Sequence, residues 1–166
     1  MTKKQSILSL LLSFLLVGAV SGLSALLTRE GMKSYETIVK PPLSPPGIVF
    51  PIVWSILFAL MAISAWMVLR ALAQSYSIKG ALCSEAMLLY FAQLAVNFFW
   101  PVFFFRFGWR LFALIWLIWL ILLIVLVWRM VRAFWRVLPA AGALQIPYLV
   151  WLLFAAYLNT GVWVLN

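Results

Sequence analysis

The chain has 166 residues, of which 67% are apolar, and its mean hydropathy is +1.15. It carries only 12 basic and 3 acidic side chains, too few to cover the surface of a water-soluble domain of this size. Histidine and aspartate are absent and cysteine occurs once, which argues against a hydrolase triad, a zinc site, a carboxylate proton relay and an intramolecular disulfide. We expect no cofactor and no metal.

Five apolar runs are separated by charged or Pro/Gly-containing breaks, and each is long enough to cross about 30 Å of hydrocarbon. They cover residues 6–27, 47–72, 82–105, 109–130 and 138–163. The sequence therefore predicts an all-α, integral membrane protein, a five-transmembrane-helix bundle that forms a single membrane domain over residues 1–166. An odd number of spans places the termini on opposite sides of the membrane.

The net charge of +9 does not indicate nucleic acid binding, because the basic residues lie at the ends of apolar runs, where they anchor helices at the membrane surface. Seven lie on the side of the N-terminus: Lys3, Lys4, Arg70, Lys79, Arg129, Arg132 and Arg136. Five lie on the other side: Arg29, Lys33, Lys40, Arg106 and Arg110. This small excess favours a cytoplasmic N-terminus.

The first run follows Met1-Thr2-Lys3-Lys4 and has some features of a signal peptide, but it continues to Leu27, which is too long for an ordinary signal. We expect an uncleaved first span. Gly18 and Gly22 form a small-xxx-small pair that would let another helix approach closely, although glycine is also common in membrane helices generally.

Residues 28–46 form the only long loop. Its four prolines fix φ and remove backbone donors, which predicts a semi-rigid cover with little helix beyond about residues 30–38. A long loop in a compact domain is usually functional or disordered, and the apolar and aromatic content favours a lid.

The second and third spans each have one face that carries aromatic or polar side chains at helical spacing. The second span places Trp54, Phe58, Met61 and Ala65 on one face, which ordinary packing would also explain. The third span places Gln93, Asn97, Trp100 and Phe104 on one face. Two amides on a single face of an apolar helix should point inward, away from lipid.

The last two spans differ from each other. The fourth span has no polar groups from Leu111 to Trp128 except indoles, those of Trp116 and Trp119 and of the terminal Trp128, so we expect it to be the most lipid-exposed or partner-facing helix. The fifth span carries a second aromatic and polar stripe at helical spacing, made by Tyr148, Trp151, Ala155 and Asn159.

Successive spans run antiparallel, so the stripes should meet in the half of the bilayer next to the loop. A buried amide without a partner costs several kcal/mol, so Gln93, Asn97 and Asn159 should bond one another, a backbone group freed by a proline, or a ligand. One interpretation is that these amides only form hydrogen bonds between helices and hold the bundle together. The tryptophan faces around the amides favour the other reading, a flat apolar ligand with a polar edge.

Three motifs resemble the translocator protein family, also called tryptophan-rich sensory proteins, over nearly the whole chain. The first is Lys40-Pro41-Pro42-Leu43-Ser44-Pro45-Pro46 leading to Val53-Trp54. The second is Gln93-Leu94-x-x-Asn97-x-x-Trp100-Pro101. The third is Pro147-Tyr148-Leu149-x-Trp151 continuing through Phe154-Ala155 and Leu158-Asn159 to Val162-Trp163. Together, in this order, the motifs are specific.

The resemblance implies a bacterial five-helix bundle of the cell membrane, commonly a homodimer. It implies a pocket for porphyrins such as protoporphyrin IX and for drug-like hydrophobic ligands of the benzodiazepine or isoquinoline type. By motif match, the ligand-binding residues would be Tyr35, Pro45, Trp54, Phe58, Asn97, Trp100, Trp151, Ala155 and Leu158.

The first hypothesis for function is a membrane receptor or sensor that binds a porphyrin or another flat hydrophobic molecule. The second, also implied by the resemblance, is light-dependent porphyrin breakdown in which Trp54 and Trp151 act as the catalytic residues through their oxidisable indoles. The third is a small hydrophobic-ligand transporter, although the chain lacks the intramembrane charges and broken repeats typical of transporters.

Overall fold

The protein is described here from a computed structural model. It covers the backbone of residues 1–28, 39–106 and 113–165, and the side chains of these residues except at 28, 100–106 and 113–116. All regular secondary structure in this part of the chain is helical, which confirms the prediction of an all-α fold.

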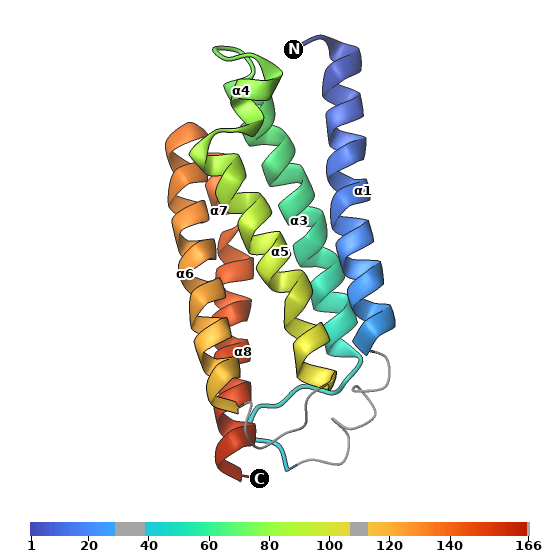
Figure 1. Cartoon of the computed structure of the whole chain (residues 1–166), viewed down its shortest axis with the longest axis vertical. Coiled ribbons are helices and arrows are strands. Elements are labelled where there is room, and N and C mark those ends of the chain that lie inside the picture. Colours follow the sequence, from blue (N-terminus) through green and yellow to red (C-terminus); the bar gives the residue numbers. More distant parts are fainter. Residues whose placement is uncertain (29–38, 107–112, 166) are drawn as a thin grey trace.

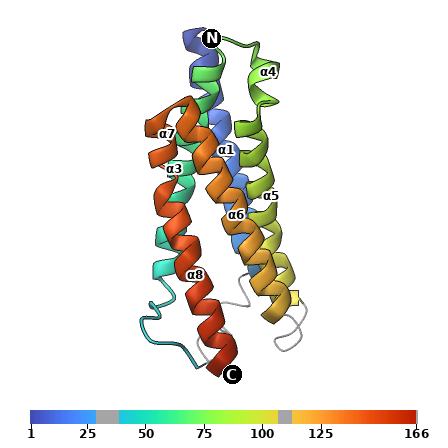
Figure 2. The same cartoon turned by 90° about the vertical axis from the view of Figure 1, so that its left-hand side faces the viewer.

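Five long helices run side by side along the molecule (Figures 1 and 2). They are α1 (Lys3–Thr28), α3 (Val49–Leu72), α5 (Glu85–Arg106), α6 (Ala113–Val137) and α8 (Ile146–Leu165). Two short helices, α4 (Ile78–Leu82) and α7 (Pro139–Ala143), precede α5 and α8. Four apolar stretches within α1, α3, α6 and α7–α8 are long enough to span a membrane, and α5 contributes a shorter one. The chain is therefore a membrane helix bundle.

Serine caps and prolines set several helix starts. The Ser77 hydroxyl accepts a hydrogen bond from Gly80 N at 3.1 Å at the start of α4, and the Ser84 hydroxyl accepts one from Met87 N at 3.3 Å at the start of α5. Pro51, Pro139 and Pro147 lie in the first turns of α3, α7 and α8, where a missing backbone donor costs nothing.

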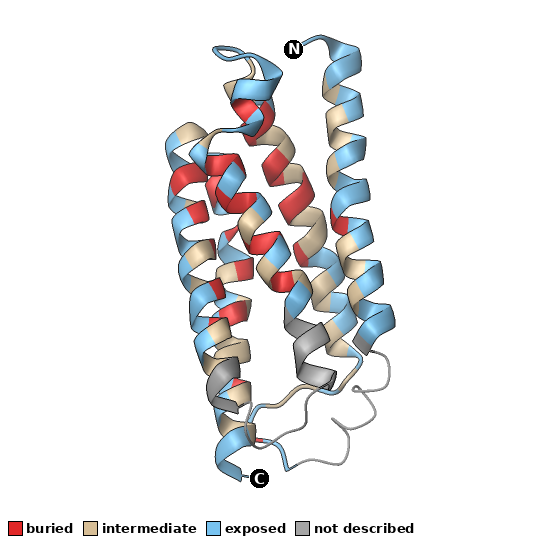
Figure 3. Cartoon of the chain, in the orientation of Figure 1, coloured by how far each residue is buried: buried red, intermediate tan, exposed pale blue. Residues whose placement is uncertain are grey.

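The core lies at the end of the bundle that holds the N-terminus and α7 (Figure 3). Helix α1 packs on α3 and α5, and α6 packs on α5, α7 and α8. The fully buried side chains include Met61, Val68, Tyr90, Met130 and Phe134. A hydrogen bond of 2.7 Å from the Ser64 hydroxyl to the carbonyl of Ala141 ties α3 to α7 within this core.

The expectation that the fourth span is the most lipid-exposed helix is wrong for the described residues. Only 6% of the apolar stretch of α1 is buried, against 33% for that of α6. Leu120, Leu123 and Val127 of α6 point into the core and are almost completely buried. Helix α6 also continues to Val137, beyond the end at 130 expected for that span.

The first apolar run forms α1, which is joined to α3 through the indole of Trp66. This indole donates to the carbonyl of Ser6 at 3.0 Å. A Cβ added at Gly18 or Gly22 would meet nothing within 4 Å. The small-xxx-small pair thus has no close neighbour among the described residues of its own chain.

Candidate functional site

The described part of the loop, residues 39–48, crosses the end of the bundle between α3 and α8 (Figure 1). The hydroxyl of Tyr157 on α8 donates to the carbonyl of Pro42 at 2.8 Å. Pro41 is buried, and a Cβ added at Gly161 of α8 would lie 2.5 Å from the Cβ of Pro41. Glycine at 161 is therefore required for this close approach, and the loop is held on α8 at two points.

The loop also contains a backbone conformation that is unusual for its residue type. Leu43 has a φ of 66°, in the left-handed region that non-glycine residues seldom occupy. The hydroxyl of Ser44 donates to the carbonyl of Pro41 at 2.7 Å, which closes a turn around Leu43. The Leu43 side chain is 82% exposed, so the turn presents an apolar residue outward.

Aromatic side chains from α3 and α8 contact each other beneath the loop, and we call them the α3–α8 aromatic rows: Phe50, Trp54, Phe58, Tyr148, Trp151, Phe154 and Tyr157. Two edge-to-face contacts join the helices, Phe50 to Trp151 with ring centroids 5.9 Å apart and Trp54 to Tyr148 at 6.0 Å. Such edge-to-face geometry is the favoured arrangement of aromatic pairs. Trp54 and Trp151 therefore each contact an aromatic ring of the other helix.

Within each helix the rows continue at helical spacing. On α3, Trp54 and Phe58 have ring centroids 5.4 Å apart. On α8, Trp151 contacts Phe154 at 5.6 Å, and Phe154 stacks on Tyr157 at 6.2 Å. Tyr157 is the residue that binds the loop, so contacts run from Phe50 of α3 through Trp151, Phe154 and Tyr157 to Pro42.

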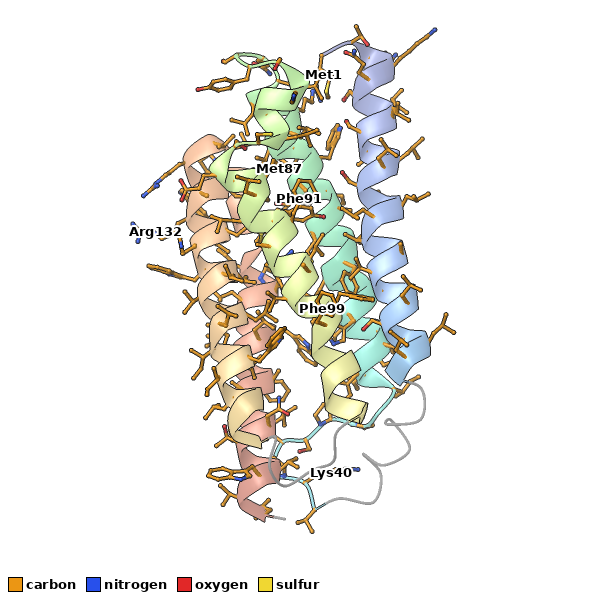
Figure 4. All side chains as sticks on the ribbon, viewed as in Figure 1. Met1, Lys40, Met87, Phe91, Phe99 and Arg132 are labelled. Atoms are coloured by element: carbon orange, nitrogen blue, oxygen red, sulfur yellow. The ribbon has the colours of Figure 1, made fainter. Side chains whose placement is uncertain are left out.

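Helix α5 brings two buried amides into the interior. Gln93 is fully buried and Asn97 is 7% exposed, as their shared helix face predicted. Neither polar atom of the Gln93 side chain has a hydrogen-bond partner, and the Nδ2 of Asn97 has none either. Figure 4 places Phe99, two residues further on, in the half of the bundle nearer the loop. An unpartnered donor in an apolar interior would gain from a ligand acceptor.

Asn159 behaves differently from these two amides. Its Nδ2 donates to the carbonyl of Ala155, one turn earlier in α8, at 2.9 Å. This bond within α8 gives the Asn159 Nδ2 a partner. The sequence had suggested another side-chain amide, a backbone group freed by a proline, or a ligand as the partner. Asn97 is therefore the better candidate for a ligand contact.

The remaining predicted ligand-binding residues differ in exposure, and two of them are not described. Ala155 and Pro45 are partly exposed, and Leu158 of α8 is 7% exposed. Tyr35 and the side chain of Trp100 lie outside the described residues. Among the described residues, Asn97 makes no hydrogen bond to the α3–α8 aromatic rows.

The sequence did not single out Phe50, Tyr148 or Tyr157 as site residues, although each makes a contact that builds the site. Phe50 lies one turn before Trp54, so helical spacing contained the signal for it. Tyr148 belongs to the α8 stripe, and its ring meets Trp54. Nothing in the local sequence pairs Tyr157 with Pro42, because the two residues are 115 positions apart.

Three further polar groups are buried without partners: the hydroxyls of Tyr90 and Tyr148 and the amide of Gln145. Tyr90 lies on α5 with Gln93, Tyr148 lies on α8, and Gln145 lies directly before α8. The chemistry available to the site is therefore that of ring faces and neutral donors. Among the residues that the structure describes, no group of three or more His, Cys, Asp or Glu side chains could hold a metal ion.

Comparison with known proteins gives a match to the TspO/MBR family over residues 10–164. The translocator protein of Bos taurus is 33% identical over 158 residues, which cover 90% of this chain and 86% of the relative. The tryptophan-rich sensory protein of Cereibacter sphaeroides is 34% identical over 157 residues, covering 91% and 87%. Protein CrtK of Rhodobacter capsulatus is 31% identical over 137 residues, covering 80% and 78%.

Proposed function

Since this chain belongs to the TspO/MBR family, we propose that it binds a porphyrin, or another flat hydrophobic molecule, against the α3–α8 aromatic rows. Membership makes it a membrane receptor or sensor of the translocator type, integral to a bacterial membrane. The proposal adds the class of ligand and the place where it binds.

Two features together carry the proposal: partly exposed rings on α3 and α8, and a buried, unpartnered donor on α5. Trp54 and Trp151 are partly exposed although each contacts an aromatic ring of the other helix. A planar ligand would gain stacking and burial against such rings. The Nδ2 of Asn97 would donate to an acceptor at the polar edge of the ligand, such as a porphyrin carboxylate or a carbonyl.

The test is a titration of the purified protein with protoporphyrin IX in the dark, in which tryptophan fluorescence is measured after each addition. We expect saturable quenching. The Trp151→Phe variant should weaken binding about three- to tenfold through lost ring area, and Asn97→Ala up to about tenfold through one lost hydrogen bond. Trp128→Phe, an exposed tryptophan on α6, serves as the matched control and should leave the affinity unchanged.

Two outcomes would contradict this proposal. The absence of saturable quenching in the wild type would mean that the aromatic rows only pack the two helices together. Equal affinities for wild type, Trp151→Phe and Asn97→Ala would place the porphyrin elsewhere on the protein.

A second candidate function, light-dependent breakdown of the bound porphyrin, is favoured by the same rings. Trp54 and Trp151 carry oxidisable indoles on the two sides of the proposed site, and each has an aromatic neighbour. Illumination of the saturated complex in air should then change the porphyrin absorption spectrum. Phenylalanine at both positions should abolish the change while some binding remains, and a persistent change would contradict this second function.

We also propose that the protein forms a homodimer, which rests on the family and on the open face of α1. Gly18 and Gly22 present small residues with nothing near them in the described part of their own chain. Mass measurement in mild detergent should give twice the chain mass. A monomer under all detergent conditions would refute the dimer without affecting the ligand site.

A further inference from the structure

The outer face of the last third of α6 combines tryptophan and arginine. Trp128, Arg129, Arg132, Trp135 and Arg136, which we call the Trp–Arg face, fall within an arc of about 120° on a helix of 3.6 residues per turn. All five side chains are exposed, and Trp128 and Trp135 are 47% and 48% exposed. Figure 4 shows Arg132 pointing away from the bundle.

The Trp–Arg face carries positive charge that the protein does not neutralise. The guanidinium of Arg129 lies 3.6 Å from a carboxylate oxygen of Glu85, and both side chains are more than half exposed. The guanidinium carbon of Arg132 lies 4.9 Å from the centre of the Trp128 ring. Neither Arg132 nor Arg136 has a carboxylate partner among the described residues.

Other cations lie at the same end of the bundle as the Trp–Arg face. Lys3 and Lys4 begin α1, Arg70 ends α3 and Lys79 lies in α4, all at the end of the bundle where α6 finishes (Figure 1). Within the described ranges Glu85 is the single acidic residue. This end of the bundle therefore attracts anions.

Below the Trp–Arg face the same side of α6 becomes entirely apolar. Ile118, Ile121, Leu122 and Val125 are 44–60% exposed, and they lie in the same arc except Leu122, which lies just beyond its edge. From Ile121 to Arg132 the helix rises about 16 Å. With 25 residues, α6 is about 7 Å longer than the hydrocarbon layer, so its last turns reach the headgroup region.

We propose that this side of α6 is a binding site for an anionic phospholipid of the surrounding bilayer. The lipid phosphate lies between Arg132 and Arg136, whose planar guanidinium groups match phosphate oxygens in geometry. The rings of Trp128 and Trp135 contact the glycerol region, as indoles do at membrane interfaces. One acyl chain lies along the exposed residues from Val125 down to Ile118.

The observations favour a lipid over a free phosphate because the cationic and apolar parts are continuous on one helix face. General anchoring of the helix by arginine and tryptophan would use the same residue types but would not discriminate between phospholipids. Selectivity for the anionic headgroup therefore separates the two explanations. The proposal is independent of the porphyrin site, which lies near the other end of α3 and α8.

The experiment is native mass spectrometry of the full chain in detergent with an equimolar mixture of phosphatidylglycerol and phosphatidylcholine. We expect the wild type to retain phosphatidylglycerol at least about fivefold over phosphatidylcholine, and the double variant Arg132→Gln, Arg136→Gln to fall below about twofold. The matched control, Lys3→Gln with Lys4→Gln, removes the same charge from the same end and should keep the wild-type preference.

Several outcomes would overturn this proposal: no preference in the wild type, an unchanged preference in the arginine variant, or an equal loss in the lysine control, which would indicate bulk charge. Displacement of phosphatidylglycerol by soluble glycerol phosphate would identify the anion alone as the ligand. If the glutamine variant does not fold, Arg132→Lys with Arg136→Lys keeps the charge and should still lower selectivity at least twofold, and unchanged selectivity would count against the site.

Discussion

The two halves of the bundle are packed differently, although the same helices run through both. We call the half that holds α7 the closed half and the half beneath residues 39–48 the loop half. On one face of α3, Met61 and Ala65 in the closed half are 0% and 1% exposed, whereas Phe58 and Trp54 in the loop half are partly exposed. Burial therefore decreases along a single helix face toward the loop.

The contacts that join the helices also differ between the halves. In the closed half, the Ser64 hydroxyl bonds the Ala141 carbonyl, and Gly142 allows α7 to approach the backbone of Trp135. In the loop half, α3 and α8 meet through aromatic side chains and one exposed tyrosine that holds the loop. From this difference we expect stability to reside mainly in the closed half, while the proposed ligand site lies in the loop half.

The largest expected effect is from Phe134→Ala in the closed half. Phe134 is fully buried and its ring lies 6.2 Å from that of Tyr90. Its loss should destabilise the protein by about 3–5 kcal/mol through lost burial and a residual cavity. Reversible unfolding in mixed micelles would measure this, with Phe58→Ala as the comparison in the loop half. A larger stability loss for Phe58→Ala would reverse the proposed division.

The next largest effect on stability is expected at Gly142, where the backbone of α7 lies close to the backbone of α6. A Cβ at this position would lie 2.9 Å from the Cα and N of Trp135, atoms that cannot rotate away. Gly142→Ala should therefore destabilise by about 1–3 kcal/mol. Gly18→Ala is the matched control, because its Cβ meets nothing within 4 Å. Similar unfolding midpoints for the two variants would show that α7 can shift without cost.

The features that sequence predicts in this fold are those expressed by periodicity. Polar residues interrupt the third span at helical spacing, so the burial of Gln93 and Asn97 could be predicted, and both are buried. The fourth span offers no such contrast, because residues 111–128 are apolar on every side. Its buried face of Leu120, Leu123 and Val127 follows from its neighbours and not from its own pattern.

The site itself could be predicted in part. The motifs identified Trp54 and Trp151, and the structure joins their helices through contacts with Tyr148 and Phe50. The pairing of Tyr157 with Pro42 was not predictable, since it depends on how the loop returns across the bundle. The hydrogen bond from Asn159 to the carbonyl of Ala155 depends on the side-chain rotamer of Asn159, which helical periodicity does not predict.

A stabilising substitution in the loop half would sharpen the comparison further. Asn97→Leu removes a buried donor that has no partner, so it should stabilise the ligand-free protein by about 1 kcal/mol while weakening porphyrin binding. Asn159→Leu is the control, because its amide already bonds Ala155 and its removal should bring no gain. Unfolding and titration of both variants would measure this. A destabilised Asn97→Leu would mean that the amide has a partner in the absence of ligand.

The smallest expected effect lies at the loop contact. Tyr157→Phe removes one hydrogen bond, from an exposed hydroxyl to the carbonyl of Pro42, and should cost about 0.5 kcal/mol, the low end for one hydrogen bond. Because that bond holds the loop over the aromatic rows, the loss should increase the porphyrin dissociation rate about twofold. Thr160→Val is the matched control, since its hydroxyl bonds Ala156 within α8. Stopped-flow dissociation rates equal in both variants would show that the loop does not retain the ligand.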